Sequence, residues 1–240
     1  MSVTHRIGFL VPSINTALES DLRELPTGVV GHVQRMPSTP RGTSSVADNS
    51  NRIATMNNQL PIVIPDLPLA HLDLLAYACT AGSFFSDWQT PHEFEAHLTE
   101  LSGLSVRSTA GSIIEMLREF PAARISLLSP YAPDVNRRMA SVLKSTGANI
   151  IQVETDPMFL EAGVSIGAEH PDEIVSFVTR VLAPGADLIL LPCSGWRALE
   201  AQHEIQASVG VPVITANQAL FWSVLCALDL DASSLWPGRG

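Results

Sequence analysis

The sequence is poor in cysteine and in basic residues. Its 240 residues include three cysteines, at positions 79, 193 and 226, which are too few and too scattered for a disulfide framework or a CxxC metal site. Lys and Arg number 14 against 24 Asp and Glu, and the formal net charge of −10 repels the phosphates of DNA and RNA. We therefore expect free thiols in a reducing compartment and no nucleic-acid partner.

Long hydrophobic runs are also absent. Nowhere do about 18 apolar residues follow one another, as a membrane span requires. The apolar run that leads to Pro12 has only five residues, too short for the core of a signal peptide. We expect a cytoplasmic protein without membrane contact. Hydrophobic residues nevertheless make up 46% of the chain, which is enough to bury a core and excludes intrinsic disorder.

Motifs for nucleotides, metals and serine hydrolases are absent or incomplete. No G-x-G-x-x-G or G-x-x-x-x-G-K-[ST] occurs, so a nucleotide cofactor has no support. His92 and His97 are five residues apart, whereas a helical zinc motif needs a spacing of four. Residues 163–167 spell G-x-S-x-G, but a nucleophile elbow directly follows a strand and opens a helix, and here the next helix starts only at Pro171. We expect neither a cofactor nor a metal.

Short β-branched or leucine-rich runs alternate with amphipathic stretches along the whole chain. This alternation is typical of βαβ units with a parallel sheet, so the predicted fold class is α/β. Helix starts are predicted after Thr90 and at Pro171, and Thr16 with Glu19 reads as a further capping box. The predicted strands span residues 7–11, 29–33, 72–76, 125–128, 149–153, 188–191 and 211–214.

A weak internal repeat divides the chain into two halves. Residues 6–12 and 124–130 both read R-I-x-x-L-x-P, an offset of 118. Residues 73–80 and 187–194 both read D-L-[LI]-x-x-x-C-[TS], an offset of 114. Near-equal offsets in the same order predict a duplicated α/β domain. We expect one domain of residues 1–108 plus 217–240, closed by the C-terminal helix, and a second of residues 109–216.

Thiols and short polar side chains follow the predicted strands, where open parallel sheets bind their ligands. Cys79 and Cys193 occupy matched places in the repeat, and we predict that their sulfurs face each other across one cleft. The neutral hydrogen-bonding residues at the same ends are Ser13, Asn15, Thr80, Ser83, Tyr131 and Ser194. Together with helix N-termini they form a cradle for a carboxylate, unless they only cap the backbone.

The three cysteines are predicted to differ. Small residues follow Cys79 and let backbone N–H groups approach its sulfur, so we expect this thiol to be partly ionised. Cys193 follows Pro192, which lacks an N–H group, so we expect it to remain a thiol. Cys226 lies in an apolar helix and is predicted to be a core residue.

These strand ends together resemble the maleate cis–trans isomerase branch of the aspartate/glutamate racemase superfamily, which has the arylmalonate decarboxylase-like fold. Within that branch the sequence is most similar to the ectoine-utilisation A proteins, in which Y-A-C-T-x-G-S-F and N-Q-A recur. Arylmalonate decarboxylases keep only the second cysteine, so Cys79 argues against their chemistry. The stretches that carry the resemblance are residues 11–16 with Glu19, 76–84, 129–131, 192–194 and 216–219.

The resemblance implies two pseudo-symmetric Rossmann-like domains with the active site at their interface. Catalysis would be cofactor-free, with Cys79 as the nucleophile and Cys193 as the acid and base. Asn15 and Tyr131 match residues that bind the substrate carboxylates. A second family asparagine falls on Gly163, which would remove one donor to a dicarboxylate. The implied partner is a small carboxylate or dicarboxylate, the implied pathway is ectoine catabolism, and a homo-oligomer is left open.

Three functions therefore remain open at this point. The first is cis–trans isomerisation through a Cys79 adduct, with Ser13, Asn15, Thr80, Tyr131 and Ser194 as the substrate-binding residues. The second is two-base racemisation or epimerisation next to a carboxylate, with the two cysteines on opposite faces of the reacting carbon. The third is non-catalytic binding of a carboxylate metabolite on the same fold.

Overall fold

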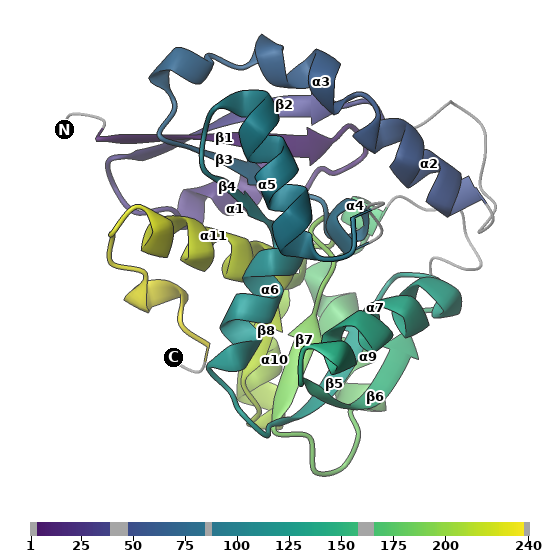
Figure 1. Cartoon of the computed structure of the whole chain (residues 1–240). Helices are drawn as coiled ribbons and strands as arrows, with labels where there is room; N and C mark the ends of the chain where they lie inside the picture. Colours follow the sequence, from purple (N-terminus) through teal and green to yellow (C-terminus); the bar gives the residue numbers. More distant parts are fainter. Residues whose placement is uncertain (1–3, 39–47, 85–87, 158–165, 238–240) are drawn as a thin grey trace.

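Two parallel sheets, one from each half of the chain, form the framework of the protein (Figure 1). The computed structural model describes residues 4–38, 48–84, 88–157 and 166–237. The first sheet has the order β2-β1-β3-β4, with β1 (His5–Pro12), β2 (Val29–Met36), β3 (Leu74–Tyr77) and β4 (Val106–Ser108). The second has the order β6-β5-β7-β8, with β5 (Arg124–Ser129), β6 (Asn149–Thr155), β7 (Leu188–Leu191) and β8 (Val213–Thr215).

The two sheets have the same strand order, and their strands correspond as the repeat predicts. The main-chain N–H of Asp73 donates to the Arg6 carbonyl at 2.8 Å, and the Arg6 N–H donates back to an Asp73 carboxylate oxygen at 2.7 Å. Asp187 and Arg124 make the same two bonds in the second half, at 2.8 and 3.0 Å. The α/β class with two parallel sheets is thereby confirmed.

All seven predicted strands occur, and one further strand does not follow from the sequence pattern. The extra strand, β4, has only three residues and includes the polar Arg107. It lies at the edge of the first sheet beside β3 and directly precedes a helix. Such a short segment lacks the alternation by which strands are recognised.

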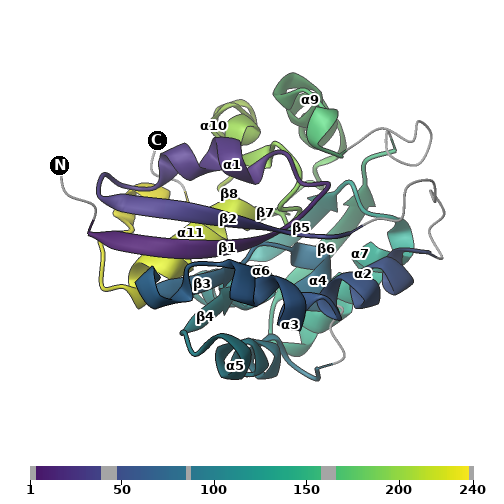
Figure 2. The ribbon, with the colours of Figure 1, turned by 90° about the horizontal axis from the view of Figure 1, so that it is seen from above.

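Helices cover both faces of each sheet, as Figure 2 shows for α1 on one side of the first sheet and α3 and α5 on the other. The first half contains α1 (Leu18–Asp21), α2 (Asp48–Asn57), α3 (Leu60–Val63), α4 (Thr80–Phe84), α5 (Pro91–Ser102) and α6 (Thr109–Arg118), with 3-10 turns η1 (Leu22–Glu24), η2 (Ile64–Asp66) and η3 (Leu69–His71). The second half contains α7 (Pro133–Ser145), α9 (Pro171–Val181), α10 (Ala198–Val209) and α11 (Ala216–Ala227), with η4 (Ile166–Ala168) and η5 (Ser233–Leu235). Among the described residues, no helix has both the length and the apolar character needed to cross a membrane.

Two predicted helix starts are confirmed. Thr90 caps α5 by accepting the Glu93 N–H, and α9 begins at Pro171 with His170 as its cap. Each cap satisfies a backbone N–H group that the first helical turn leaves without a partner.

Helix α11 packs against the first sheet although it follows the last strand of the second sheet in the sequence. Its residues Leu220, Phe221, Val224 and Leu225 share a buried cluster with apolar residues of β1 and β3. The prediction that Cys226 belongs to the core is wrong, because this residue lies on the exposed side of α11. The domain limits at residues 108 and 216 stay a prediction.

Candidate active site

The turn that carries Cys79 and the turn that carries Cys193 are hydrogen-bonded to each other. Cys79 lies between β3 and α4, and Cys193 follows β7. The Ser194 N–H donates to Thr80 Oγ1, and Ser194 Oγ donates to the Ala78 carbonyl, both at 3.2 Å. The residues on either side of Cys79 therefore contact the neighbour of Cys193, as expected for strand ends that meet between two sheets.

Both thiols are buried, and Tyr131 lies beside them. The exposed fraction is 8% for Cys79 and 3% for Cys193. Tyr131, in the loop between β5 and α7, places its hydroxyl within hydrogen-bonding reach of the Cys193 thiol and of Thr80. Burial raises the pKa of Tyr131 well above its usual value, and the nearby thiols raise it further. Four of the predicted site residues thus lie together in one buried region.

Burial decides the ionisation of the two thiols. Desolvation raises the pKa of Cys79 to about 12, although the Gly82 N–H donates to its sulfur at 3.3 Å. Desolvation likewise raises the pKa of Cys193 to about 11 against donors at Tyr131 and at the following backbone. The prediction of a partly ionised Cys79 is therefore wrong for this state: removal from water outweighs the local N–H groups.

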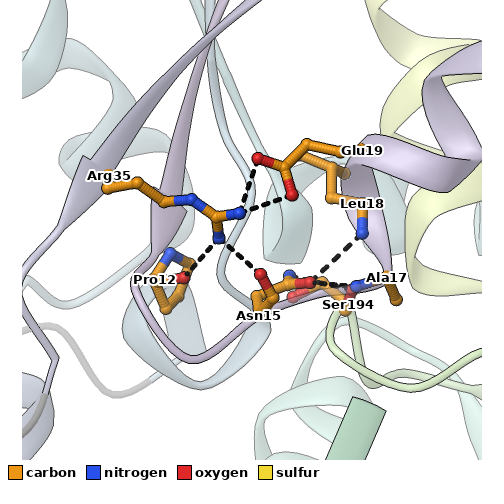
Figure 3. Close-up of polar contacts among 7 residues, drawn as sticks. All are labelled: Pro12, Asn15, Ala17, Leu18, Glu19, Arg35 and Ser194. Carbon is orange, nitrogen blue, oxygen red and sulfur yellow. Dashed lines mark hydrogen bonds and ion pairs between the residues drawn. The ribbon is translucent and has the colours of Figure 1, made fainter. Parts of the chain in front are cut away.

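Asn15 links the first half to the turn after β7 (Figure 3). Its Oδ1 accepts the N–H groups of Ala17 at 3.0 Å and Leu18 at 3.2 Å, and its Nδ2 donates to the Ser194 carbonyl at 3.0 Å. The predicted capping box of Thr16 and Glu19 is wrong, because Asn15 takes the capping role. An amide has two donor hydrogens, and Asn15 uses one of them on an acceptor among the described residues.

Arg35 fixes the loop that carries Asn15. Its guanidinium donates to the Pro12 carbonyl at 3.2 Å and to the Asn15 carbonyl, and it pairs with both carboxylate oxygens of Glu19 (Figure 3). A planar guanidinium suits this arrangement because its donors point in fixed directions. The two serines predicted nearby make hydrogen bonds within the chain, and the role of Ser13 in substrate binding stays a prediction. Ser13 is exposed and pairs with Ser38, and Ser83 bonds to the Cys79 carbonyl.

Sequence reasoning missed a buried pair next to Ser194. Asn217, at the start of α11, donates through Nδ2 to the Ser194 carbonyl at 3.0 Å and to Asp21 Oδ2 at 2.7 Å. Burial raises the pKa of Asp21 to about 7. The N-Q-A motif points to Asn217, but nothing in the local pattern singles out Asp21.

A second missed group lies behind Cys193. The Trp196 indole N–H donates to Glu169 Oε2, and both side chains are buried. Burial raises the pKa of Glu169, and the neighbouring Asp156 raises it further. Gly163 lies outside the described residues, so its effect on substrate binding stays a prediction. Among the described residues there is no group of three His, Cys, Asp or Glu side chains able to hold a metal ion.

Comparison with known proteins identifies the family. The family model for arylmalonate decarboxylase matches residues 67–239. The chain belongs to the arylmalonate decarboxylase family. It is 25% identical over 260 aligned residues to a maleate isomerase from Geobacillus stearothermophilus, and the match covers 100% of both chains.

Solved structures of this family share the fold described above. The maleate isomerase Iso from Pseudomonas putida S16 superposes with a TM-score of 0.83 at 21% identity, covering 98% of each chain. A cysteine-to-serine variant of the Nocardia farcinica maleate cis–trans isomerase superposes with a TM-score of 0.79 at 24% identity, covering 94% of this chain and 93% of that one. That variant carries a covalently bound succinylcysteine intermediate.

Proposed function

We propose that this member of the arylmalonate decarboxylase family is a cofactor-independent cis–trans isomerase of a small dicarboxylate of the maleate type. The observation that carries the proposal is the hydrogen-bonded contact between the turns of Cys79 and Cys193, with Tyr131 beside both. Two buried thiols next to one tyrosine supply a nucleophile and a proton donor. The relatives named above support the same reaction class, since they are maleate isomerases.

The proposed reaction starts once Cys79 has lost its proton to solvent while Cys193 is a thiol, and this is a minor form of the free protein because burial raises the pKa of Cys79 to about 12. The Cys79 sulfur forms a bond to one alkene carbon, and the π electron pair moves onto the other alkene carbon and into the carboxylate attached to it, which gives an enediolate. Cys193 protonates the other alkene carbon, which leaves a succinyl thioether with a single bond that can rotate. Cys193 then takes the proton back, the C–S bond breaks, and the trans product leaves with Cys79 again a thiolate.

Neutral donors would hold the carboxylates in this scheme. One amide hydrogen of Asn15 has no acceptor among the described residues, and the Tyr131 hydroxyl lies next to the reacting thiols. Thr80 and Ser194 would complete the site from the two turns. Charge that develops on the enediolate is stabilised by such preorganised donors in a buried site.

A two-base racemase or epimerase is the second candidate. Cys79 and Cys193 lie on equivalent turns, are both buried, and have pKa values raised to about 12 and about 11. Nearly matched groups suit the removal of a proton on one face of a carbon and its return on the other. Decarboxylation is disfavoured because the sequence has both cysteines.

Incubation with maleate in D₂O, followed by NMR, tests the proposal. We expect fumarate from the wild type. In Cys79→Ser the rate of isomerisation should fall by roughly 10³-fold or more, because a serine hydroxyl does not ionise near neutral pH. Cys193→Ala should accumulate a Cys79 adduct with the mass of one substrate molecule. Cys226→Ala is the matched control and should retain full activity, because this residue lies on the exposed side of α11.

The same experiment separates the alternatives. The substrate panel should include 2-substituted maleates, α-amino and α-hydroxy acids, and phenylmalonate. We also infer a cytoplasmic role in ectoine catabolism from residues 77–84 and 217–219, so the panel should include the carboxylates released from ectoine. Deuterium exchange at an α-carbon without any adduct would replace the isomerase by a racemase. Binding without exchange, adduct or product would leave only a carboxylate-binding protein.

A further inference from the structure

The sequence contains two tyrosines, and each lies beside one of the two buried cysteines. Tyr131 is the neighbour of Cys193. Tyr77, two residues before Cys79, is fully buried on β3, and its ring packs edge to face on Phe94 with 4.9 Å between centroids. The proposed reaction above uses Tyr131 and gives Tyr77 no part.

The Tyr77 hydroxyl sits between α2 and the turn that holds Cys79. It donates to Asn57 Oδ1 at the end of α2, and Asn57 Nδ2 donates to the Gly82 carbonyl at 3.1 Å. A methyl group placed on Gly82 would lie 2.0 Å from Tyr77 Oη, and the Gly82 N–H donates to Cys79 Sγ at 3.3 Å. The hydroxyl and the sulfur therefore both lie against Gly82 in the first turn of α4, and the hydroxyl is near enough to the thiol to lower its pKa.

A tyrosine hydroxyl has one proton to donate and lone pairs to accept with. While the Tyr77 hydroxyl donates its hydrogen bond to Asn57, the Tyr77 oxygen is free to accept a hydrogen bond from the Cys79 S–H. Once Cys79 is ionised, the stronger bond is the one from the hydroxyl to the negatively charged sulfur. Asn57 and the Cys79 thiolate therefore compete as acceptors for the one hydrogen bond that the Tyr77 hydroxyl can donate.

We propose that Tyr77 is a positioning residue for Cys79. When the Cys79 thiolate forms, the Tyr77 hydroxyl turns its hydrogen bond from Asn57 to the sulfur, and Asn57 opposes this change by competing for the same hydrogen bond. The part of this pair in catalysis rests on the proposed function, in which Cys79 is the nucleophile. Its effect on the ionisation of Cys79 does not depend on any substrate. The readout can therefore be a property of the sulfur alone.

The test is the rate of alkylation of Cys79 by iodoacetamide as a function of pH, measured on the full chain by peptide-resolved mass spectrometry. Tyr77→Phe keeps the ring on Phe94 and removes only the hydroxyl, so the Cys79 profile should move to higher pH and alkylation at a fixed pH should slow by roughly tenfold. Asn57→Ala should move the profile to lower pH, because the proton is then free for the sulfur. The double variant should behave as Tyr77→Phe.

Thr109→Val provides a structural control, because it removes the bond from Thr109 Oγ1 to the Tyr77 carbonyl at 3.0 Å and leaves the hydroxyl intact. It should lower stability without moving the Cys79 profile. Shifts of the same sign in Tyr77→Phe and Asn57→Ala, or no shift in either, would overturn the inference. Thiolate ultraviolet absorbance in a chain with Cys79 as its single cysteine gives a second measurement that does not require the reagent to reach the sulfur.

Failure of this inference and failure of the proposed function give different results. Unshifted profiles with full isomerase activity would remove Tyr77 from the mechanism and leave the function intact. Opposite shifts without turnover of any carboxylate would retain the link between Tyr77 and Cys79 and overturn the function.

Discussion

Asp21 is a fully buried carboxyl group at the end of α1 that contacts Asn217 of α11. Its Oδ2 accepts from Asn217 at 2.7 Å, whereas its Oδ1 has no hydrogen-bond partner among the described residues. Desolvation raises its pKa from 3.8 to about 7, with Glu200 raising it further and Arg23 opposing. A buried acid of this kind prefers its neutral form, because ionisation without solvent is costly.

The first prediction at the residue scale concerns stability against pH. In the unfolded chain Asp21 loses its proton near pH 4, and in the folded protein only near pH 7, so the free energy of unfolding falls as the pH rises between these values. Asp21→Asn removes this fall, which amounts to about 4 kcal/mol at most. Urea unfolding at pH 4.5 and pH 8 measures it.

Asp187→Asn is the control for this experiment, because it should leave the change in stability between pH 4.5 and pH 8 as it is in the wild type. The hydrogen bond from Arg124 lowers the pKa of Asp187 to about 2, so its contribution to stability is present above pH 4 and is lost on acidification. An unchanged pH dependence in Asp21→Asn would mean that Asp21 is ionised in the folded protein.

At the scale of elements, the short helix α4 is shaped by what its glycine touches. Within a helix, alanine is normally more favourable than glycine by about 1 kcal/mol. At Gly82 a Cβ atom would lie 2.0 Å from Tyr77 Oη and 2.9 Å from Met56 Cε. The close approach of β3 and α2 therefore overrides the propensity of the helix.

We accordingly predict that Gly82→Ala destabilises the protein by roughly 1–3 kcal/mol, despite the gain in helix propensity. Adding Tyr77→Phe should recover part of the loss, because the nearest atom is then gone. Gly195→Ala is the matched control, because the nearest atom to its Cβ would be Asn15 Cγ at 3.7 Å, an ordinary van der Waals distance. Thermal unfolding of the three variants and the wild type measures the effect, and a stabilised Gly82→Ala would contradict the packing described here.

At the scale of the whole molecule, α11 packs against elements of both halves of the chain. Ala216 and Ala219 lie in the buried cluster with α6 and β5, whereas Phe221 and its neighbours lie in the cluster with β1 and β3. The same helix supplies Asn217 to the Ser194 carbonyl. We therefore expect the two sheets to lose their structure together.

Phe221→Ala tests this coupling. Phe221 is fully buried and packs edge to face on Phe9 at 5.8 Å, so its truncation should cost about 3–5 kcal/mol. Hydrogen exchange should show the same loss of protection in β1 and in β5. Cys226→Ala, on the exposed side of the same helix, should change neither. A loss confined to the first sheet would show that the sheets unfold independently.

Much of this fold could be predicted from the sequence, because strands and helix starts are local patterns. The repeated Asp73 and Asp187 mark equivalent strand starts, and the cysteines that follow lie on turns that meet. Neighbours in sequence were sufficient for these inferences.

Features that depend on distant residues could not be predicted in this way. The thiol ionisation of Cys79 follows from burial by elements of the whole first half, and a count of nearby N–H groups gives the wrong sign. Asp21 acquires its role from Asn217, which lies 196 residues further along the chain. The apolar composition of residues 219–228 predicts that Cys226 is a core residue, whereas the orientation of α11 decides its exposure.

The Ser194 carbonyl oxygen, which accepts hydrogen bonds from two asparagines, has a consequence for evolution and for mutagenesis. The Ser194 carbonyl takes amide hydrogens from Asn15 and Asn217, and so joins three segments of the chain at one main-chain oxygen. Every amino acid brings that oxygen, so the side chain at position 194 can vary while the junction persists. An alanine scan detects the junction at Asn15 and Asn217, where a donor is lost, and not through the acceptor itself. The acceptor strength of this oxygen is altered through the main chain, by an ester in place of the peptide bond between residues 194 and 195.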